Sequence, residues 1–484
     1  MLTVERTNIN IKAKSERVVP LYIDLNTESR ISNLANRISS MEDDLVKKTL
    51  DKVLNEFEKR HIKLKEILLQ HYKNVEPLVD MPEIKSLQKK LLLGTYLTKE
   101  YSVESAALFN PSIVPHPNQE NLNEGELRFV LSLRATGEGH ISSIEFRTGK
   151  ITKEGKITLD PMSSEIVSLS TIENTRLQKK FLIDRIGFYD NVNRSMLDLF
   201  PEEFSRQEAL QIIGKLSSKN QKTNTESVNA LLDIFDANYD ISFDKNIEIN
   251  NRVIFPRSNA ESMGMEDVRF VKFFDGDKSK YIGTYTAYNG KNIRPQMIET
   301  EDFTNFKIRS LYGNAAFNKG MALFPEKING KYAMIGRQDG ESISIMYSDD
   351  LYFWDTYKVI QKSQHDWDFL QLGNCGSPIK TSKGWLLLTH AVGPLRKYVM
   401  SASLLDLKNP EKVLNTLDEP FFSPNESERI GYVPNVVYTC GFLKHYDKLI
   451  IPYALSDISS SFGIVNVDDI LNELKPNKSL CEKF

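Results

Sequence analysis

Charged side chains interrupt an otherwise apolar, strand-like segment of this sequence. The run Gly264–Val271 (GMEDVRFV) holds Glu266, Asp267 and Arg269 between apolar neighbours. Charges beside buried positions are costly unless they pair with one another or bind a ligand. A carboxyl group held in this way could protonate a leaving oxygen, and basic side chains nearby could hold an anion.

Polar residues recur at the ends of other strand-like segments. These residues are Asn110, Ser112, Arg147, Lys319, Arg337, Gln371, His390, Tyr398 and Asp457. Taken singly, each has a structural explanation: an Asp-x-Arg pair can be an ion pair, His390 can be a hydrogen-bonded core histidine, and Arg337 can cap a turn. Independent surface charges would not be expected to recur at strand ends, so the shared placement favours one convergent site.

A repeated strand pattern accounts for that placement. Each repeat has a polar or glycine lead, an aromatic or apolar run of strand formers, and a return to small or charged residues. The repeats are Lys280–Gly290 (KYIGTYTAYNG), Lys331–Gly340 (KYAMIGRQDG), Gly384–Gly393 (GWLLLTHAVG) and Asp447–Asp457 (DKLIIPYALSD). The spacings between Tyr281, Tyr332, Trp385 and Leu449 are 51, 53 and 64 residues. A similar second segment follows each of the first three, and Glu126–Gly137 (ELRFVLSLRATG) makes a fifth unit.

A period of about 50 residues built from paired strands is typical of a β-propeller. Each unit alone would expose an apolar face and open edges, so the units are expected to close radially. The fold class predicted is mainly β, a five-bladed β-propeller over residues 101–470, followed by a C-terminal tail at 471–484. An open array of sheets is the alternative.

Two helical additions are expected. In the N-terminal extension, residues 1–100, apolar residues at three- and four-residue spacing predict one long amphipathic helix over 41–72, capped by Ser40. A helical insertion is predicted at about 175–235, with helices near 208–216 and 228–234 and a polar loop at 217–227 between them. We expect both additions to pack on the main domain or on a sister subunit, so a homo-oligomer through the helical extensions is a hypothesis.

Bulk composition argues against several classes of function. The chain of 484 residues has a formal net charge of −3, which gives no electrostatic reason to expect nucleic acid or an anionic membrane as partner. Its three cysteines are scattered, and no ligand spacing indicates a metal site. No signal peptide or membrane-spanning stretch is evident, so a cytoplasmic location is expected.

The sequence resembles glycoside hydrolase family 130. The runs that carry the resemblance are FNPSIV (109–114), GMEDVRFV (264–271), NKGMALFPEKINGKYAMIGR (318–337), GNCGSPIKTSKGWLLLTHAV (373–392), YVMSASLLD (398–406) and VPNVVYTCG (433–441). They cover roughly residues 100–165 and 240–470, in the family's order. The family comprises β-mannoside phosphorylases and some β-mannosidases on a five-bladed propeller.

The resemblance implies that Asp267 is the sole catalytic acid. Val268 replaces the proline that usually follows it, while Arg269 is kept. We expect the like charge of Glu266 to raise the pKa of Asp267. In the family's phosphorylases the proton passes through a sugar hydroxyl, and phosphate attacks the anomeric carbon with inversion. An inverting hydrolase would instead need a base that activates water.

The resemblance also implies roles for the remaining polar residues. Phosphate-binding positions are Lys319, Arg337, Gln371, His390 and Tyr398, and substrate-binding positions are Asn110, Ser112, Arg147, Glu266, Arg269 and Asp457. Gln371 departs from the family, which usually has a lysine there, so the anion site lacks one cation. Inorganic phosphate is expected as a co-substrate, with no cofactor and no metal.

The reaction implied is inverting phosphorolysis of a β-mannosyl oligosaccharide, which gives α-mannose 1-phosphate and a shortened acceptor. A β-mannosidase that uses the same acid is the alternative. A non-catalytic sugar-binding propeller is a third possibility, which the retention of Asp267 disfavours.

Overall fold

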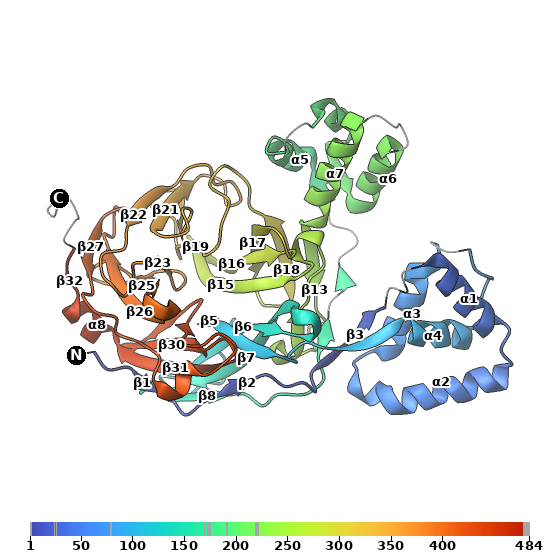
Figure 1. Ribbon diagram of the computed structural model, residues 1–484, viewed down its shortest axis with the longest axis horizontal. Coiled ribbons are helices and arrows are strands. Elements are labelled where there is room, and N and C mark those ends of the chain that lie inside the picture. The colour runs from blue at the N-terminus through green and yellow to red at the C-terminus, as the bar shows by residue number, and fades with distance from the viewer. Residues whose placement is uncertain are drawn as a thin grey trace.

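The computed structural model describes residues 2–23, 25, 27–77, 80–168, 170–171, 176–189, 192–217 and 222–477. The chain is mainly β, with two groups of helices outside the β-rich body (Figure 1). Within the described residues, no helix combines the length and the apolar character needed to cross a membrane.

Most strands belong to five antiparallel meanders that follow one another along the chain. The strands of the meanders are, in order: β5 (Ala107–Pro115), β6 (Leu127–Thr136), β7 (Ser142–Ile151) and β8 (Ile157–Leu159); β15 (Gly264–Asp275), β16 (Lys278–Tyr288), β17 (Ile293–Thr300) and β18 (Asn305–Ser310); β19 (Ala322–Leu323), β20 (Tyr332–Gly336), β21 (Ile343–Ser348) and β22 (Lys358–Gln361); β23 (Gln371–Asn374), β24 (Ile379–Lys380), β25 (Trp385–Val392), β26 (Tyr398–Leu405) and β27 (Val413–Thr416); β28 (Val437–Tyr438), β29 (Leu443–His445), β30 (Lys448–Leu455) and β31 (Ser459–Asn466).

The repeat read from the sequence corresponds to these meanders. Tyr281, Tyr332, Trp385 and Leu449 lie on β16, β20, β25 and β30, and each of these strands pairs with the strand before it and the strand after it. The expected fifth unit is the meander that contains β6.

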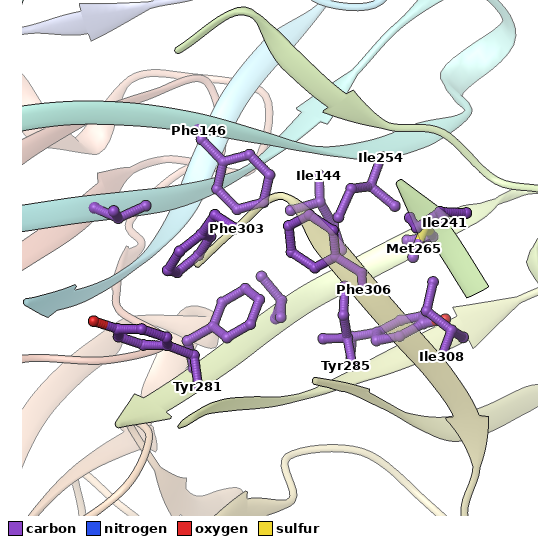
Figure 2. Close-up of a cluster of buried hydrophobic side chains, with 14 of the residues drawn as sticks. Ile144, Phe146, Ile241, Ile254, Met265, Tyr281, Tyr285, Phe303, Phe306 and Ile308 are labelled. Carbon is purple, nitrogen blue, oxygen red and sulfur yellow. The ribbon is translucent and has the colours of Figure 1, made fainter. Parts of the chain in front are cut away.

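Apolar cores lie between neighbouring meanders. Phe146 of β7 meets Phe303 edge-on at a centroid distance of 5.5 Å and stacks on Phe306 at 6.1 Å. These rings join the first two meanders in a cluster that also holds Tyr281 and Tyr285 (Figure 2). At the other end of the chain, β30 and β31 of the last meander pack on β5 of the first, and their apolar residues share one buried cluster.

The ends of the chain join sheets rather than standing apart. β1 (Glu5–Arg6) and β2 (Ile11–Lys12) both pair with β31, so these two strands join the last meander although they fall within the expected extension at 1–100. β3 (Val18–Tyr22) pairs with β4 (Thr98–Ser102) and connects the helical extension to the body. The expected tail at 471–484 contains the end of α8 (Val467–Glu473) and the strand β32 (Lys475–Pro476), which pairs with β27. Residues 478–484 lie outside the described residues.

The single long helix expected over 41–72 is wrong. The structure has α1 (Glu28–Ser39), α2 (Asp43–Phe57), α3 (Leu64–Val75) and α4 (Leu87–Tyr96), with Lys63 in a left-handed conformation between α2 and α3. Ser40 is the C-cap of α1 rather than an N-cap.

The break between α2 and α3 lets both helices bury their apolar sides within this chain. Leu50 and Leu54 of α2, Leu64 and Leu68 of α3 and Leu91 of α4 form one buried cluster. Gly94 permits the close crossing of α3 and α4, since a Cβ there would lie 2.2 Å from the Leu68 carbonyl oxygen. These leucines of the stripe are therefore covered within this chain, whereas Leu45 is 51% exposed, and a homo-oligomer through the helical extensions stays a prediction.

The helical insertion consists of α5 (Lys179–Ile186), α6 (Arg206–Ser217) and α7 (Lys222–Asp236), which share a core of their own. Asp233 of α7 ties it to β17 through an ion pair with Arg294 at 2.6 Å. The loop expected at 217–227 is shorter, because α7 begins at Lys222; residues 218–221 lie outside the described residues.

The remaining short elements connect these parts. They are β9 (Val167–Ser168), β10 (Ser170–Thr171), β11 (Arg176–Gln178), β12 (Glu203–Ser205), β13 (Tyr239–Ser242) and β14 (Arg252–Ile254), and the 3-10 helices η1 (Glu58–Arg60), η2 (Glu138–His140), η3 (Arg194–Leu199), η4 (Ile249–Asn251), η5 (Asn259–Glu261), η6 (Pro394–Arg396) and η7 (Glu426–Arg429).

Candidate active site

A cavity of about 210 Å³ collects side chains from all five meanders. The lining residues are Asn110, Arg134, Asp267, Arg269, Lys319, Gly320, Arg337, Gln371, Gly373, Asn374, His390, Arg396, Tyr398, Val433, Val436, Tyr438 and Asp457. The polar strand-end residues noted in the sequence are thus brought together, although up to 347 residues separate them along the chain.

Irregular backbone aims three of these side chains. Asn110 lies at a bulge in β5 and Asp267 at a bulge in β15, where the pairing register shifts. Asn110, Asp267 and Asp457 have φ values of 49°, 56° and 54°, in the left-handed region that Asn and Asp tolerate better than other non-glycine residues. Left-handed backbone in such residues is typical of functional sites, where the surrounding fold supports the strain.

Asp267 is held in its ionised form. The Asn110 amide donates a hydrogen bond to Oδ1 at 2.7 Å, and the Arg134 guanidinium lies 3.4 Å from the same oxygen. Burial disfavours the negative charge of Asp267, but the positive charges of Arg134 and Arg269 and the hydrogen bond from Asn110 outweigh burial. The pKa of Asp267 is therefore below its ordinary value. The raised pKa expected from Glu266 is therefore wrong.

The negative charge of Glu266 does not raise the pKa of Asp267, because both Glu266 oxygens are paired with cations. Oε1 accepts from Arg134 at 2.7 Å, and Oε2 accepts from Lys319 at 2.8 Å. Glu266 does not line the cavity, and it positions the two cations that do. Lys319, predicted to bind phosphate, is thus paired with the carboxylate next to Asp267 in the sequence.

Arg269 lines the cavity between Asp267 and Tyr438 and contacts both. Its guanidinium donates to the Asp267 backbone carbonyl at 2.9 Å and to the Tyr438 hydroxyl. Burial disfavours the charge of Arg269, yet Tyr438 and Asp267 raise its pKa overall. The adjacent Val268 is buried among apolar side chains, so the bulge forms without the family's proline.

A second group of side chains in the cavity lining has the composition of an anion-binding face. The Arg337 guanidinium Nη1 lies 3.3 Å from His390 Nε2, and the Gln371 side-chain amide lies 3.2 Å from the same nitrogen. Tyr398 stacks on the His390 ring at a centroid distance of 6.1 Å. The buried Nε of Arg337 has no hydrogen-bond partner among the described residues. A guanidinium with free donors is well suited to an oxyanion.

Asp457 is the second carboxyl group of the cavity. Burial, and then the neighbouring charge of Asp267, raise the pKa of Asp457 to about 6. Arg134 and Arg396 act in the opposite direction. The two carboxyl groups therefore differ in their proton affinity, since Asp267 is the stronger acid and Asp457 the weaker.

Besides Glu266, two further predicted substrate-binding residues, Arg147 and Ser112, lie outside the cavity lining. Arg147 is buried between Glu104 and Glu145, at 2.5 and 3.1 Å, in a cluster completed by Arg17. A substrate cannot reach a guanidinium that is 2% exposed and already paired. Ser112 is also buried, and its Oγ accepts a hydrogen bond from the Phe270 backbone N–H at 3.1 Å, linking β5 to β15.

Sequence reasoning missed several lining residues. Arg134 lies near the end of the strand-like run Glu126–Gly137, as the predicted residues do in their own strand-like runs. Asn374 and Tyr438 stand inside the runs that carry the family resemblance, and Arg396 precedes Tyr398 by two positions. The signal was present for Arg134, but its contact with Glu266 and Asp267 depends on tertiary structure.

Within the described residues, no group of three or more His, Cys, Asp or Glu side chains could hold a metal ion. The arrangement instead offers a carboxyl group for proton transfer on one side of the cavity and donors for an oxyanion on the other.

The chain matches known proteins over this same region. Residues 193–476 match the family model of glycoside hydrolase family 130, described as beta-1,4-mannooligosaccharide phosphorylase. A 1,2-beta-oligomannan phosphorylase of Thermoanaerobacter sp. (strain X514) is 34% identical over 46% of this chain and 75% of its own length. A beta-1,2-mannobiose phosphorylase of Listeria innocua is 32% identical over 46% of this chain and 63% of its own length.

A solved structure of beta-1,2-mannobiose phosphorylase from Listeria innocua, in complex with beta-1,2-mannobiose, superposes with a TM-score of 0.46 at 21% identity. The superposition covers 77% of this chain and 93% of that one. Because the family model spans more than half of the residues and a relative above 30% identity is covered over three quarters of its length, this chain belongs to glycoside hydrolase family 130.

Proposed function

We propose that this protein is an inverting β-mannoside phosphorylase, which converts a β-mannosyl oligosaccharide and phosphate into α-mannose 1-phosphate and a shortened acceptor. One observation carries the proposal: Asp267 and the group formed by Arg337, Gln371, His390 and Tyr398 line the same cavity. The relatives whose printed names are mannoside phosphorylases support the same conclusion.

We infer that the five meanders are the blades of a propeller with the cavity at its centre. The inference is supported by the packing of the last meander on the first, which share the buried cluster of Ile113, Leu131, Ile450 and Phe462. It is also supported by the N-terminal strands β1 and β2, which pair with the last meander and so link the two ends of the chain.

In the proposed mechanism, Asp267 supplies the proton that the leaving oxygen requires, through a hydroxyl of the bound sugar. Asn110 and Arg134 hold this carboxyl group in place. Arg337, His390 and Tyr398 hold phosphate so that one of its oxygens attacks the anomeric carbon while the glycosidic bond breaks. Hydrogen phosphate and the mannoside then give mannose 1-phosphate and the acceptor alcohol, and the proton of the phosphate balances the one delivered to the acceptor.

The low pKa of Asp267 has a consequence for this mechanism. With the cavity free of ligand, the carboxyl group is ionised at neutral pH because Arg134, Arg269 and Asn110 favour its charge. A sugar hydroxyl that replaces the Asn110 or Arg134 contact would weaken this effect and raise the pKa toward the range useful to an acid. Asn110 also offers a sugar hydroxyl an acceptor beside this carboxyl group, since its buried Oδ1 has no partner among the described residues.

Gln371 keeps β-mannoside hydrolysis as the alternative, because an uncharged amide replaces the usual lysine in the anion site. The decisive measurement is the release of mannose 1-phosphate and of free mannose from a panel of β-manno-oligosaccharides, with and without phosphate. We expect mannose 1-phosphate only when phosphate is present. Phosphate-independent release of mannose would exclude the phosphorylase and establish the hydrolase.

The role of Asp267 is tested by Asp267→Asn, which keeps the shape of the side chain and removes its acid. We expect phosphorolysis to fall by a factor of about 10²–10⁴, the usual contribution of a general acid. The matched control is Asp349→Asn, an exposed carboxylate paired with Lys331. Unchanged turnover of the Asp267 variant would show that another group is the acid.

We further propose a cytoplasmic location. Cys375 and Cys440 are buried free thiols, as is usual for proteins of reducing compartments.

A further inference from the structure

The tautomer of His390 is fixed by the groups that contact its two ring nitrogens. Nδ1 lies 3.0 Å from the backbone carbonyl oxygen of Asn374, which can only accept a hydrogen bond. Nε2 lies 3.3 Å from Nη1 of Arg337 and 3.2 Å from the amide nitrogen of Gln371, and both of these groups are donors. The ring therefore carries its proton on Nδ1 and presents a lone pair at Nε2.

The ring is also kept neutral. His390 is 2% exposed, and burial together with the charges of Arg337 and Arg269 lowers its pKa well below the ordinary value. A protonated ring would direct an N–H at the Arg337 guanidinium, which has no acceptor. The neutral form with Nε2 as acceptor is thus the one that the packing and the hydrogen bonds both require.

The lone pair faces the anion-binding side of the cavity. Arg337 and Gln371, which surround Nε2, both line the cavity, and so does Gly373, whose missing Cβ leaves space beside Cε1 and Nε2. An oxyanion held by Arg337 at this face meets an acceptor at His390. An anion oxygen without a proton is repelled by that lone pair, whereas an oxygen that carries a proton can donate to it.

We propose that His390 makes this site select anions that keep a proton at neutral pH, phosphate and arsenate, over sulfate. In this arrangement the bound anion draws the Arg337 and Gln371 donors away from Nε2 to its unprotonated oxygens, and its P–OH group donates to the lone pair that they leave. The inference rests on the proposed function, because it takes the phosphate site to be the one lined by His390. It adds a reason for discrimination between tetrahedral anions of similar size.

The test is equilibrium binding of phosphate, arsenate and sulfate to the full chain by titration calorimetry, at pH 7.5 and constant ionic strength. We expect phosphate and arsenate to bind with similar affinity and sulfate to bind at least about tenfold more weakly, the factor that one hydrogen bond to a charged group contributes. His390→Asn presents an amide that can donate as well as accept, so the difference between phosphate and sulfate should fall to about threefold or less.

The matched control is Arg337→Lys, which should weaken phosphate and sulfate by similar factors and preserve their ratio. Sulfate binding to the wild-type chain within threefold of phosphate would overturn the role of His390 and leave the proposed function intact. Absence of phosphate binding would instead refute the phosphate site itself. The wild-type comparison needs no variant, and ¹⁵N shifts of the His390 ring give a second reading: protonation at Nε2 would overturn the inference even if His390→Asn did not fold.

Discussion

Gly373 offers a sharp test of the anion-binding face, because its lack of a side chain leaves room for His390. The two residues are directly opposite each other on β23 and β25. A Cβ added at Gly373 would lie 2.5 Å from His390 Cε1, 2.8 Å from Nε2 and 3.3 Å from Nη1 of Arg337. The backbone of Gly373 does not have the positive φ that would strain an alanine, so the effect of Gly373→Ala is steric.

The size of the effect follows from these distances. Carbon atoms in contact prefer a separation of about 3.5–4.0 Å, so the His390 ring must move by about 1 Å. It cannot move without cost, since Nδ1 is bonded to the Asn374 carbonyl oxygen and Tyr438 contacts the ring at a centroid distance of 4.9 Å. Overpacking of this kind costs about 1–3 kcal/mol of folding stability. A displacement of about 1 Å in a site that positions a reactant can reduce its rate about 100-fold.

The assay is mannose 1-phosphate release at varied phosphate and at varied mannoside. We expect kcat/KM for phosphate to fall about 100-fold in Gly373→Ala, with little change in the binding of the mannoside. The control is Gly214→Ala in α6, where, apart from the helix's own backbone and the adjacent residues, no atom of the described residues lies within 4 Å of the added Cβ. A Gly373→Ala protein that melts near the wild-type temperature and retains kcat/KM for phosphate within threefold would refute the placement of phosphate beside His390.

Two further predictions concern the other charged groups. Because the folded-state pKa of Asp457 is about 6, above the ordinary 3.8, its ionisation opposes folding, so wild-type stability relative to Asp457→Asn should fall as pH rises from about 4 to about 6. Above pH 6, Asp457→Asn should be more stable than the wild type by on the order of 2 kcal/mol. Urea unfolding of both proteins at several pH values measures this, and a stability difference that does not change with pH would contradict the raised pKa. In Arg147→Met, Arg17 is the one cation among the described residues that still pairs with Glu104 and Glu145. The free energy of unfolding should therefore fall by about 3–5 kcal/mol, while KM for phosphate and for mannoside stays unchanged. A selective rise in KM for mannoside would restore Arg147 to the substrate site.

The strand pattern of the meanders could be predicted from the sequence alone. Strand formers repeat at about 50-residue spacing, and each repeat corresponds to a hairpin whose hydrogen bonds are local in the chain. Polar residues near strand ends follow the same repeat, which is why the sequence indicates Asp267, Arg337, His390 and Asp457, all of which line the cavity. Local pattern is sufficient where the partner strand is the next one in the sequence.

The helical extension could not be predicted in the same way. The apolar periodicity over 41–72 continues across the turn at Lys63, so it carries no sign of the break. What decides the break is the shared cluster of α2, α3 and α4, in which both halves bury their leucines, and a cluster of this kind depends on where distant segments meet.

Tertiary structure alone decided the pKa values in the site and which of two arginines lines the cavity. Arg134 and Arg147 both belong to strands of the first meander, and the strand pattern alone does not tell which of them reaches the cavity. Only Arg134 contacts Asp267, whereas Arg147 is buried between Glu104 and Glu145. The pKa of Asp267 followed from the same geometry: proximity of Glu266 in the chain suggested repulsion, but Glu266 is neutralised by Arg134 and Lys319. Charge interactions depend on distance in space, which sequence neighbours share only in part.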